Sequence, residues 1–240
     1  MTLLLVNCTT EGAEVVTDTL GHAADFSRSL HCSKTLLLPH ADILAAISGL
    51  EDLKSHYFAM LAGGQLGSTF EEMAAVTPEA LRMLAGELGH DRHADLDLDI
   101  DDCVDWSKRT GSIVHLIGPT NDGAFDGAIF RAEHDYEREP YDTLSGPVCI
   151  VQPSRPHFAS AESTGWSSIE DLTALAALIR DEQMSSPPGE RILIGGRLIL
   201  TAVGANGAAH RVIGLFEDSD EVWDRYFDGM PIAASKWAAR

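Results

Sequence analysis

The chain has 240 residues and a hydrophobic content of 45%, which is ordinary for a globular protein and sufficient for a sizeable core. Its 17 basic residues against 37 acidic residues leave a formal net charge of −20. Such a charge disfavours direct binding to nucleic acid or to anionic membranes and favours a basic protein partner. Salt adaptation or coding bias explains the charge equally well, because only four of the basic residues are Lys.

The cysteines are far apart and contain no C-x-x-C pair, a spacing that favours neither a zinc site nor a disulfide scaffold. No signal peptide is recognisable, and no segment reaches the ~20 apolar residues of a membrane-spanning helix. We therefore expect no metal, no cofactor and no membrane contact. The expected location is the cytoplasm or a particle assembled in the cytosol.

The N-terminal third is predicted to be mainly helical. Thr2–Asn7 and Thr35–Leu38 are short apolar runs expected to form buried strands. The weak helical pattern of Ala13–Ser29 between them suggests a parallel βαβ unit. Ala41–Ala62 carries a stripe of apolar residues at helical spacing, which predicts a long helix.

Two more helices are expected before residue 90. Thr69–Val76 forms the first, and Thr77-Pro78 supplies an N-cap and a proline at the first helical position of the second, which runs to about Leu88. No basic face accompanies these helices, so packing is favoured over DNA binding.

The stretch from 95 to 101, DLDLDID, alternates with a period of two. It predicts a half-buried strand whose solvent face carries Asp95, Asp97, Asp99 and Asp101. This acidic ladder is interpreted as a solvated face that blocks edge pairing or as a docking strip for a basic partner. A calcium site is disfavoured because the loop pattern is not matched. The neighbouring His90 and His93 lack an identifiable further metal ligand.

Three strands are expected over Ser112–Gly118, Gly127–Ala132 and Pro147–Gln152, followed by a helix over Ser168–Met184. The connections at 120–135 and 153–165 contain His, Asp, Arg and Ser residues of the kinds that hydrolases use. No nucleophile-elbow or other catalytic motif accompanies them.

The clearest local structure lies near the C-terminus. Arg197–Gly204 and Ala208–Phe216 are apolar runs joined through Asn206-Gly207, which is a strong hairpin signal. Together with Arg191–Ile194 they predict an antiparallel meander.

A capped helix is expected after this hairpin, beginning near Asp218. Its aromatic face, which includes Trp223, Tyr226 and Phe227, either packs on the sheet or anchors a partner.

The sequence thus predicts an α+β fold in which an N-terminal helical segment precedes a largely antiparallel sheet with flanking helices. Residues 1–240 are expected to form one domain; the alternative divides them into a helix-rich segment at 1–90 and a sheet-rich domain at 91–240. The expected function is that of a non-enzymatic acidic interaction protein or structural subunit of an oligomer or larger assembly. The alternative is a small-molecule hydrolase or transferase with site loops near 120–135 and 153–165.

Overall fold

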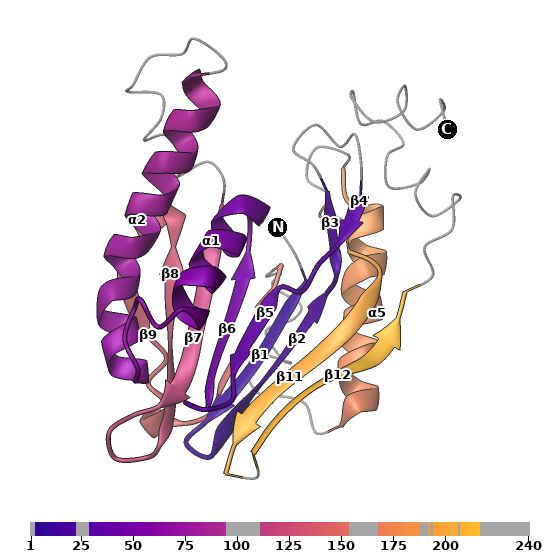
Figure 1. Ribbon diagram of the computed structural model, residues 1–240. Helices are drawn as coiled ribbons and strands as arrows, with labels where there is room; N and C mark the ends of the chain where they lie inside the picture. Colours follow the sequence, from indigo (N-terminus) through magenta and orange to yellow (C-terminus); the bar gives the residue numbers. More distant parts are fainter. Residues whose placement is uncertain are drawn as a thin grey trace.

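The computed structural model describes residues 3–22, 29–94, 111–153, 168–187, 192, 194–205 and 207–216. Two five-stranded antiparallel sheets dominate it (Figure 1). The first sheet has the strand order β10 (Val148–Gln152), β1 (Leu4–Thr9), β2 (Gly12–Asp18), β11 (Arg197–Gly204) and β12 (Gly207–Leu215). The second sheet has the order β5 (Thr35–Leu38), β6 (Ile43–Ser48), β7 (Ile113–Pro119), β8 (Phe125–Arg131) and β9 (Arg138–Pro140).

The remaining elements are short or cover the sheets. A two-stranded ribbon consists of β3 (Leu20–His22) and β4 (Ser29–His31). The α-helices of the described residues are α1 (Glu51–Ala62), α2 (Phe70–Ala94) and α5 (Ile169–Ser185). Single 3-10 turns, η1 (Ala132–His134) and η2 (Thr143–Ser145), flank β9.

Three apolar layers define the stacking order of the elements. One layer packs α1 and α2 on the second sheet, through side chains such as Tyr57, Phe70 and Phe130. A second layer lies between the two sheets, and a third packs α5 on the first sheet. The order is therefore helices, second sheet, first sheet, helix, so both sheets have both faces covered over much of their area.

The predicted fold class is wrong. The chain begins with strands, no helical segment precedes the sheets, and two stacked sheets replace the single sheet that was expected. The parallel βαβ unit is also absent from the described residues, because β1 and β5 belong to different sheets and every strand pairing there is antiparallel. Ala13–Ser29, predicted as a helix, begins with β2 and β3.

Ala41–Ala62 was expected to be one helix, but its first part is β6. All six residues of β6 are buried, with Ile43, Ala45 and Ile47 facing the helices and Leu44 and Ala46 facing the first sheet. A strand buried on both faces is apolar throughout, and such a run cannot be distinguished from a buried helix by periodicity. Gly49, at φ +132°, separates β6 from α1.

Several local predictions are confirmed. The expected strands near 2–7, 35–38, 112–118, 127–132 and 147–152 correspond to β1, β5, β7, β8 and β10, and the helix expected over 168–184 is α5. The C-terminal hairpin is β11–β12. The predicted meander is wrong in its third strand, because Ile192 and Ile194 are not in a strand and the other neighbour of β11 is β2. The prediction of two helices that meet at Thr77-Pro78 is wrong, because α2 is one helix with Pro78 inside it.

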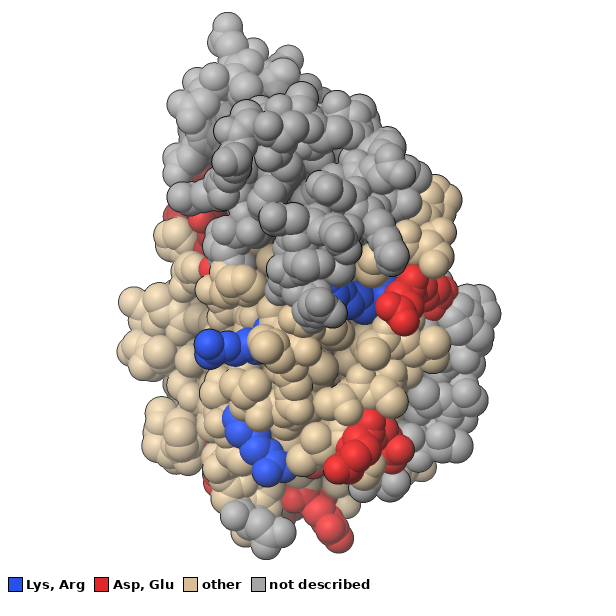
Figure 2. Space-filling view, turned by 90° about the vertical axis from the view of Figure 1, so that its right-hand side faces the viewer, with Lys and Arg blue, Asp and Glu red and all other residues tan. Residues whose placement is uncertain are grey.

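Figure 2 shows the side of the molecule on which β12 and α5 lie in Figure 1. Acidic and basic side chains both occur there, in several small groups with uncharged surface around them. Although the net charge is −20, the acidic side chains do not form a continuous patch on the described part of this side.

Candidate functional site

A buried ion pair lies where β2 ends and β5 is about to begin. Lys34 Nζ is 2.7 Å from Asp18 Oδ1, and the side chains are 8% and 0% exposed. Asp18 also accepts the backbone N–H of Leu3 on Oδ1, at 3.1 Å, and that of Gly195 on Oδ2, at 3.2 Å. This single carboxylate thus joins the start of β1, the segment before β5 and the segment before β11.

A second set of polar contacts holds the segment that carries Lys34. Lys54, from α1, donates to the backbone carbonyl of Ser33 at 2.8 Å and pairs with Glu51 Oε2 at 2.7 Å. The Cys32 thiol donates to the same Glu51 oxygen at 3.1 Å. Burial and the hydrogen bond to Glu51 raise the pKa of Cys32. For Glu51 burial acts in the upward direction, but hydrogen bonds from Lys54 and Cys32 outweigh it and lower the pKa.

A cavity of about 660 Å³ is lined by the chain segments that carry Asp18 and Lys34. Thr19 and Ser33, the chain neighbours of Asp18 and Lys34, both line it, and so does Gly196. Gly196 has φ +74°, and a Cβ atom there would lie 2.5 Å from Thr19 Oγ1 and 2.6 Å from His31 Nδ1. Only glycine therefore fits this part of the wall without displacing both side chains.

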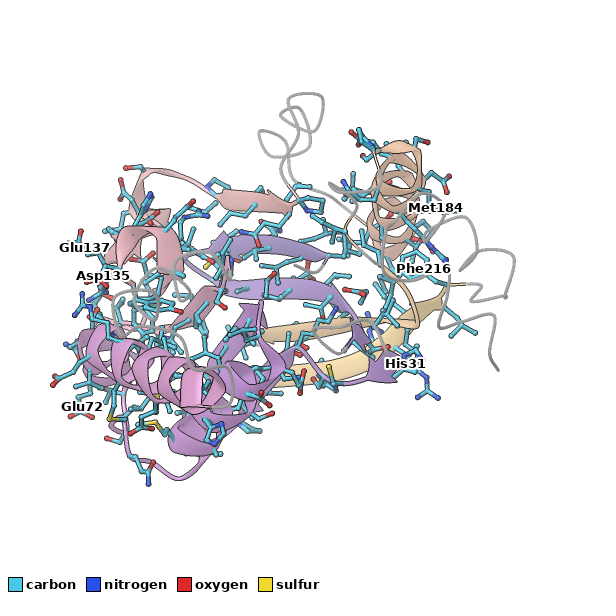
Figure 3. All side chains as sticks on the ribbon, turned by 90° about the horizontal axis from the view of Figure 1, so that it is seen from above. His31, Glu72, Asp135, Glu137, Met184 and Phe216 are labelled. Carbon is cyan, nitrogen blue, oxygen red and sulfur yellow. The ribbon has the colours of Figure 1, made fainter. Side chains whose placement is uncertain are left out.

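The cavity lies at the end of the hairpin where β12 finishes. His31 and Phe216, which both line it, lie on the same side of the molecule in Figure 3, away from Glu72, Asp135 and Glu137. Its size is within the range of small-ligand sites. A buried charge pair beside such a cavity contributes little net stability, because desolvation offsets the attraction. The pair and the neighbouring cavity together form the candidate functional site.

The residues proposed from sequence as partner-binding are not described by the structure. Asp95, Asp97, Asp99 and Asp101 lie outside the described ranges, as do Trp223, Tyr226 and Phe227. The 153–165 loop is described only at Pro153.

The 120–135 segment is described and does not meet the Asp18–Lys34 pair. Its first part is the β7–β8 turn, in which the Thr120 hydroxyl donates to Asp122. At its other end His134 Nδ1 contacts Glu139 at 2.7 Å, and Asp135 pairs with Arg82 of α2. These contacts join the η1 turn to β9 and to α2.

Sequence reasoning missed both Asp18 and Lys34. The signal available was a rare lysine directly before an apolar strand, where a charge requires a buried partner. The partner could not be identified because residues 13–29 were assigned to a helix. Within the described residues there is no group of three metal-ligating side chains, and no helix is long and apolar enough to span a bilayer.

No protein-family model matches the chain, and no curated protein matches it in sequence. Solved structures do resemble it. The helical assembly of the Anbu complex from Pseudomonas aeruginosa matches with a TM-score of 0.62 at 10% identity, over 99% of this chain and 92% of that one.

Two further solved structures resemble the chain to a similar degree. Anbu, an ancestral beta-subunit, from Yersinia bercovieri has a TM-score of 0.59 at 11% identity, with 99% and 97% of the two chains covered. A mutant of Anbu from a Hyphomicrobium species has a TM-score of 0.58 at 10% identity, with coverage of 100% and 98%. At these identities the likeness concerns the fold: the chain is similar in fold to Anbu proteins over almost its whole length.

Proposed function

We propose that the protein is an amide-bond hydrolase whose nucleophile is the Thr2 hydroxyl. The observation that carries this proposal is the convergence of Lys34 Nζ and the Leu3 N–H on one oxygen of Asp18. Thr2 is covalently joined to Leu3, and consecutive Cα atoms are about 3.8 Å apart. The amide that directly follows Thr2 in the chain therefore shares its acceptor oxygen with the buried Lys34 ammonium group.

The chemistry follows from the residue types. A threonine hydroxyl is a weak nucleophile that needs a base, and the α-amine of the same residue serves as that base in one established form of the nucleophile–base arrangement. The hydroxyl oxygen attacks the substrate carbonyl while the amine accepts its proton. The amine then returns the proton to the departing nitrogen, which leaves an ester on Thr2 that water hydrolyses.

Lys34 and Asp18 have supporting roles in this scheme. The ammonium group of Lys34 supplies fixed positive charge where negative charge develops on the attacking and carbonyl oxygens, and such charge is most effective in a site that excludes water. Asp18 holds Lys34 in place and is itself held by the Leu3 and Gly195 amides. The scheme requires a free amine on Thr2, so the peptide bond between Met1 and Thr2 must be cleaved.

The test combines mass spectrometry with hydrolysis of fluorogenic peptide amides. The active protein should begin at Thr2, and an electrophilic acylating probe should modify the peptide that contains Thr2. Thr2→Ala and Lys34→Met should each reduce kcat by at least about 100-fold. Thr10→Ala, at an exposed position, is the matched control and should keep full activity. Equal activity of Thr2→Ala and the unaltered protein would exclude the proposal.

A second proposed role is that of an assembly subunit. It is supported by the fold shared with a protein solved as a helical assembly. It is also supported by β12, a nine-residue edge strand whose first six residues are exposed, because exposed edges are templates for pairing with another chain. Light scattering coupled to size exclusion should show a particle of several subunits. A lone monomer at micromolar concentration would contradict this role.

The acidic ladder remains a proposed docking strip for a basic partner within such an assembly. Changing Asp95, Asp97, Asp99 and Asp101 together to Asn should weaken a complex recovered from the source, and added salt should weaken it in the same way. A complex unaffected by both changes would contradict a role for the ladder.

A further inference from the structure

β12 forms an edge of the first sheet (Figure 1). It has nine residues, and the first six, Gly207 to Val212, are exposed. On one side it pairs with β11. An edge strand presents a row of backbone N–H and C=O groups on its other side, and these groups can pair with a further strand.

The other edges of the two five-stranded sheets carry features that oppose such pairing. β5 has four residues and is followed by Pro39, and β10 has five residues and is followed by Pro153. β9 has three residues, the last of which is Pro140. Short strands and proline, which cannot donate a backbone hydrogen bond, are common ways of blocking an edge. β12 is longer than any of these strands and contains no proline, so it is the edge best suited to a partner strand.

The composition of β12 suits a second copy of this chain as the partner. Two copies with a net charge of −20 repel each other, so a contact between them is favoured where neither surface carries a carboxylate. β12, all of which the structure describes, contains no Asp or Glu, and its one charged side chain at neutral pH is Arg211. It also carries Val212, whose apolar side chain is 53% exposed and would be covered by a second strand.

Strand geometry indicates how the two copies would align. Gly207 has φ +94°, which belongs to the hairpin turn, and the register between β11 and β12 shifts just beyond Val212. The regular part of the edge therefore runs from Ala208 to Val212, and its central residue is His210. An antiparallel pair of identical strands has a twofold axis, and an axis at His210 pairs the whole regular part with itself.

We infer that β12 pairs with β12 of a second copy, antiparallel about a twofold axis at His210, so that the two first sheets become one continuous sheet. This inference rests on the proposed assembly role and names its contact. Ala208 of one copy is then opposite Val212 of the other. Arg211 is opposite Ala209, so the two arginines do not face each other directly.

The first test uses two double variants that change the same exposed positions. Ala208→Lys/Val212→Lys places like charges opposite each other on both sides of the axis, and it should raise the Kd of the pair by roughly tenfold or more. Ala208→Lys/Val212→Glu places opposite charges there, and its Kd should stay within about threefold of that of the unaltered protein. Light scattering over a dilution series measures each Kd, and circular dichroism checks that both variants fold. Equal effects of the two variants would overturn the inference.

The second test is cross-linking under mild oxidation. His210→Cys should give a disulfide-linked dimer, because a residue on the axis faces its own copy with Cβ atoms about 4.5–5.5 Å apart. Ala209→Cys is the matched control, since its two copies lie diagonally, about 7–8 Å apart, which is too far for a disulfide. The unaltered protein accounts for links through the native cysteines. Linkage through Ala209→Cys, or through neither variant, would overturn the inference.

The outcomes separate this contact from the assembly role as a whole. A particle of several subunits that Ala208→Lys/Val212→Lys leaves intact would uphold the assembly role and overturn the pairing of β12. A monomer whose β12 amides are protected from hydrogen exchange would show that another segment of the same chain covers the edge, and it would overturn both. A particle that Ala208→Lys/Val212→Lys dissociates and Ala208→Lys/Val212→Glu preserves would support both.

Discussion

Asp18 and Lys34 form a pair whose members depend on each other, because both are removed from water. Lys34→Met leaves the Asp18 carboxylate buried without its cation, which should cost about 3–5 kcal/mol of unfolding free energy. The double variant Asp18→Asn/Lys34→Met should lose less than the sum of the single losses. Urea unfolding of the four proteins measures this coupling.

The exposed pair Arg82–Asp135 provides the control for that cycle. Its side chains are 43% and 66% exposed, so its coupling should not exceed about 1 kcal/mol. Additive losses at Asp18 and Lys34 would show that the pair does not act as a unit in the folded protein.

His115, on β7, makes stability depend on pH. Burial, followed by the nearby Arg131 charge, lowers the pKa of His115 to about 3, and Nδ1 contacts the Tyr141 hydroxyl at 2.6 Å. In the unfolded chain the pKa is about 6.5, so between pH 6.5 and 3 the unfolded state binds the extra proton. Stability is therefore lost as pH falls through this window, by up to about 1.4 kcal/mol for each pH unit.

His115→Asn tests this assignment because asparagine keeps a polar atom near the Tyr141 hydroxyl and does not titrate. Its unfolding free energy should depend less steeply on pH between 6.5 and 3 than that of the unaltered protein. His56→Asn, on an exposed part of α1, should leave the slope unchanged. An unaltered slope in His115→Asn would refute the contribution of this histidine.

At the scale of the elements, the pairing of β2 with β11 depends on a glycine. Gly12 is opposite Gly204, and a Cβ atom on Gly12 would lie 2.4 Å from the Val203 carbonyl oxygen. That obstacle is backbone, which cannot rotate away. Gly12→Ala should therefore destabilise the protein by about 1–3 kcal/mol more than Gly64→Ala, which shares a positive φ but has open space around it. Thermal unfolding of the two variants makes the comparison, and equal losses would mean that β2 and β11 separate freely at this end.

The elements differ in how well the sequence alone predicts them. The β11–β12 hairpin was predictable because Asn-Gly between apolar runs is a local signal. Residues 43–48 were not, because a strand covered on both faces has no polar side to reveal its period. Pro78 was expected to start a new helix, yet α2 continues through it, and the Thr77 hydroxyl there donates to the Met73 carbonyl.

The candidate site was less predictable than the elements, for a related reason. Asp18 and Lys34 are 16 residues apart, and their meeting depends on the ribbon of β3 and β4 that returns the chain between them. Gly195, which also contacts Asp18, is 177 residues away along the chain. Contacts of this range follow from the stacking of the sheets, and no local pattern in the sequence contains that information.

At the scale of the whole molecule, both sheets combine strands from both parts of the chain. The first sheet takes β1 and β2 from before residue 90 and β10, β11 and β12 from after it. The second sheet takes β5 and β6 from before residue 90 and β7, β8 and β9 from after it. A division between residues 90 and 91 would separate hydrogen-bonded strands in each sheet. We therefore propose that residues 1–240 fold as one domain.

One domain implies one unfolding transition. Near- and far-ultraviolet circular dichroism should show the same unfolding transition in urea. In hydrogen exchange, the slowest-exchanging backbone amides of β2 and β8 should give the same free energy of opening. Leu44→Ala, in the layer between the sheets, should lower that free energy in both strands by about 2–5 kcal/mol. Leu144→Ala, at a position that is 80% exposed, should change the free energy of opening in either strand by no more than about 0.5 kcal/mol. A loss from Leu44→Ala confined to the second sheet would mean that the two sheets unfold separately, because the layer they share would then not couple them.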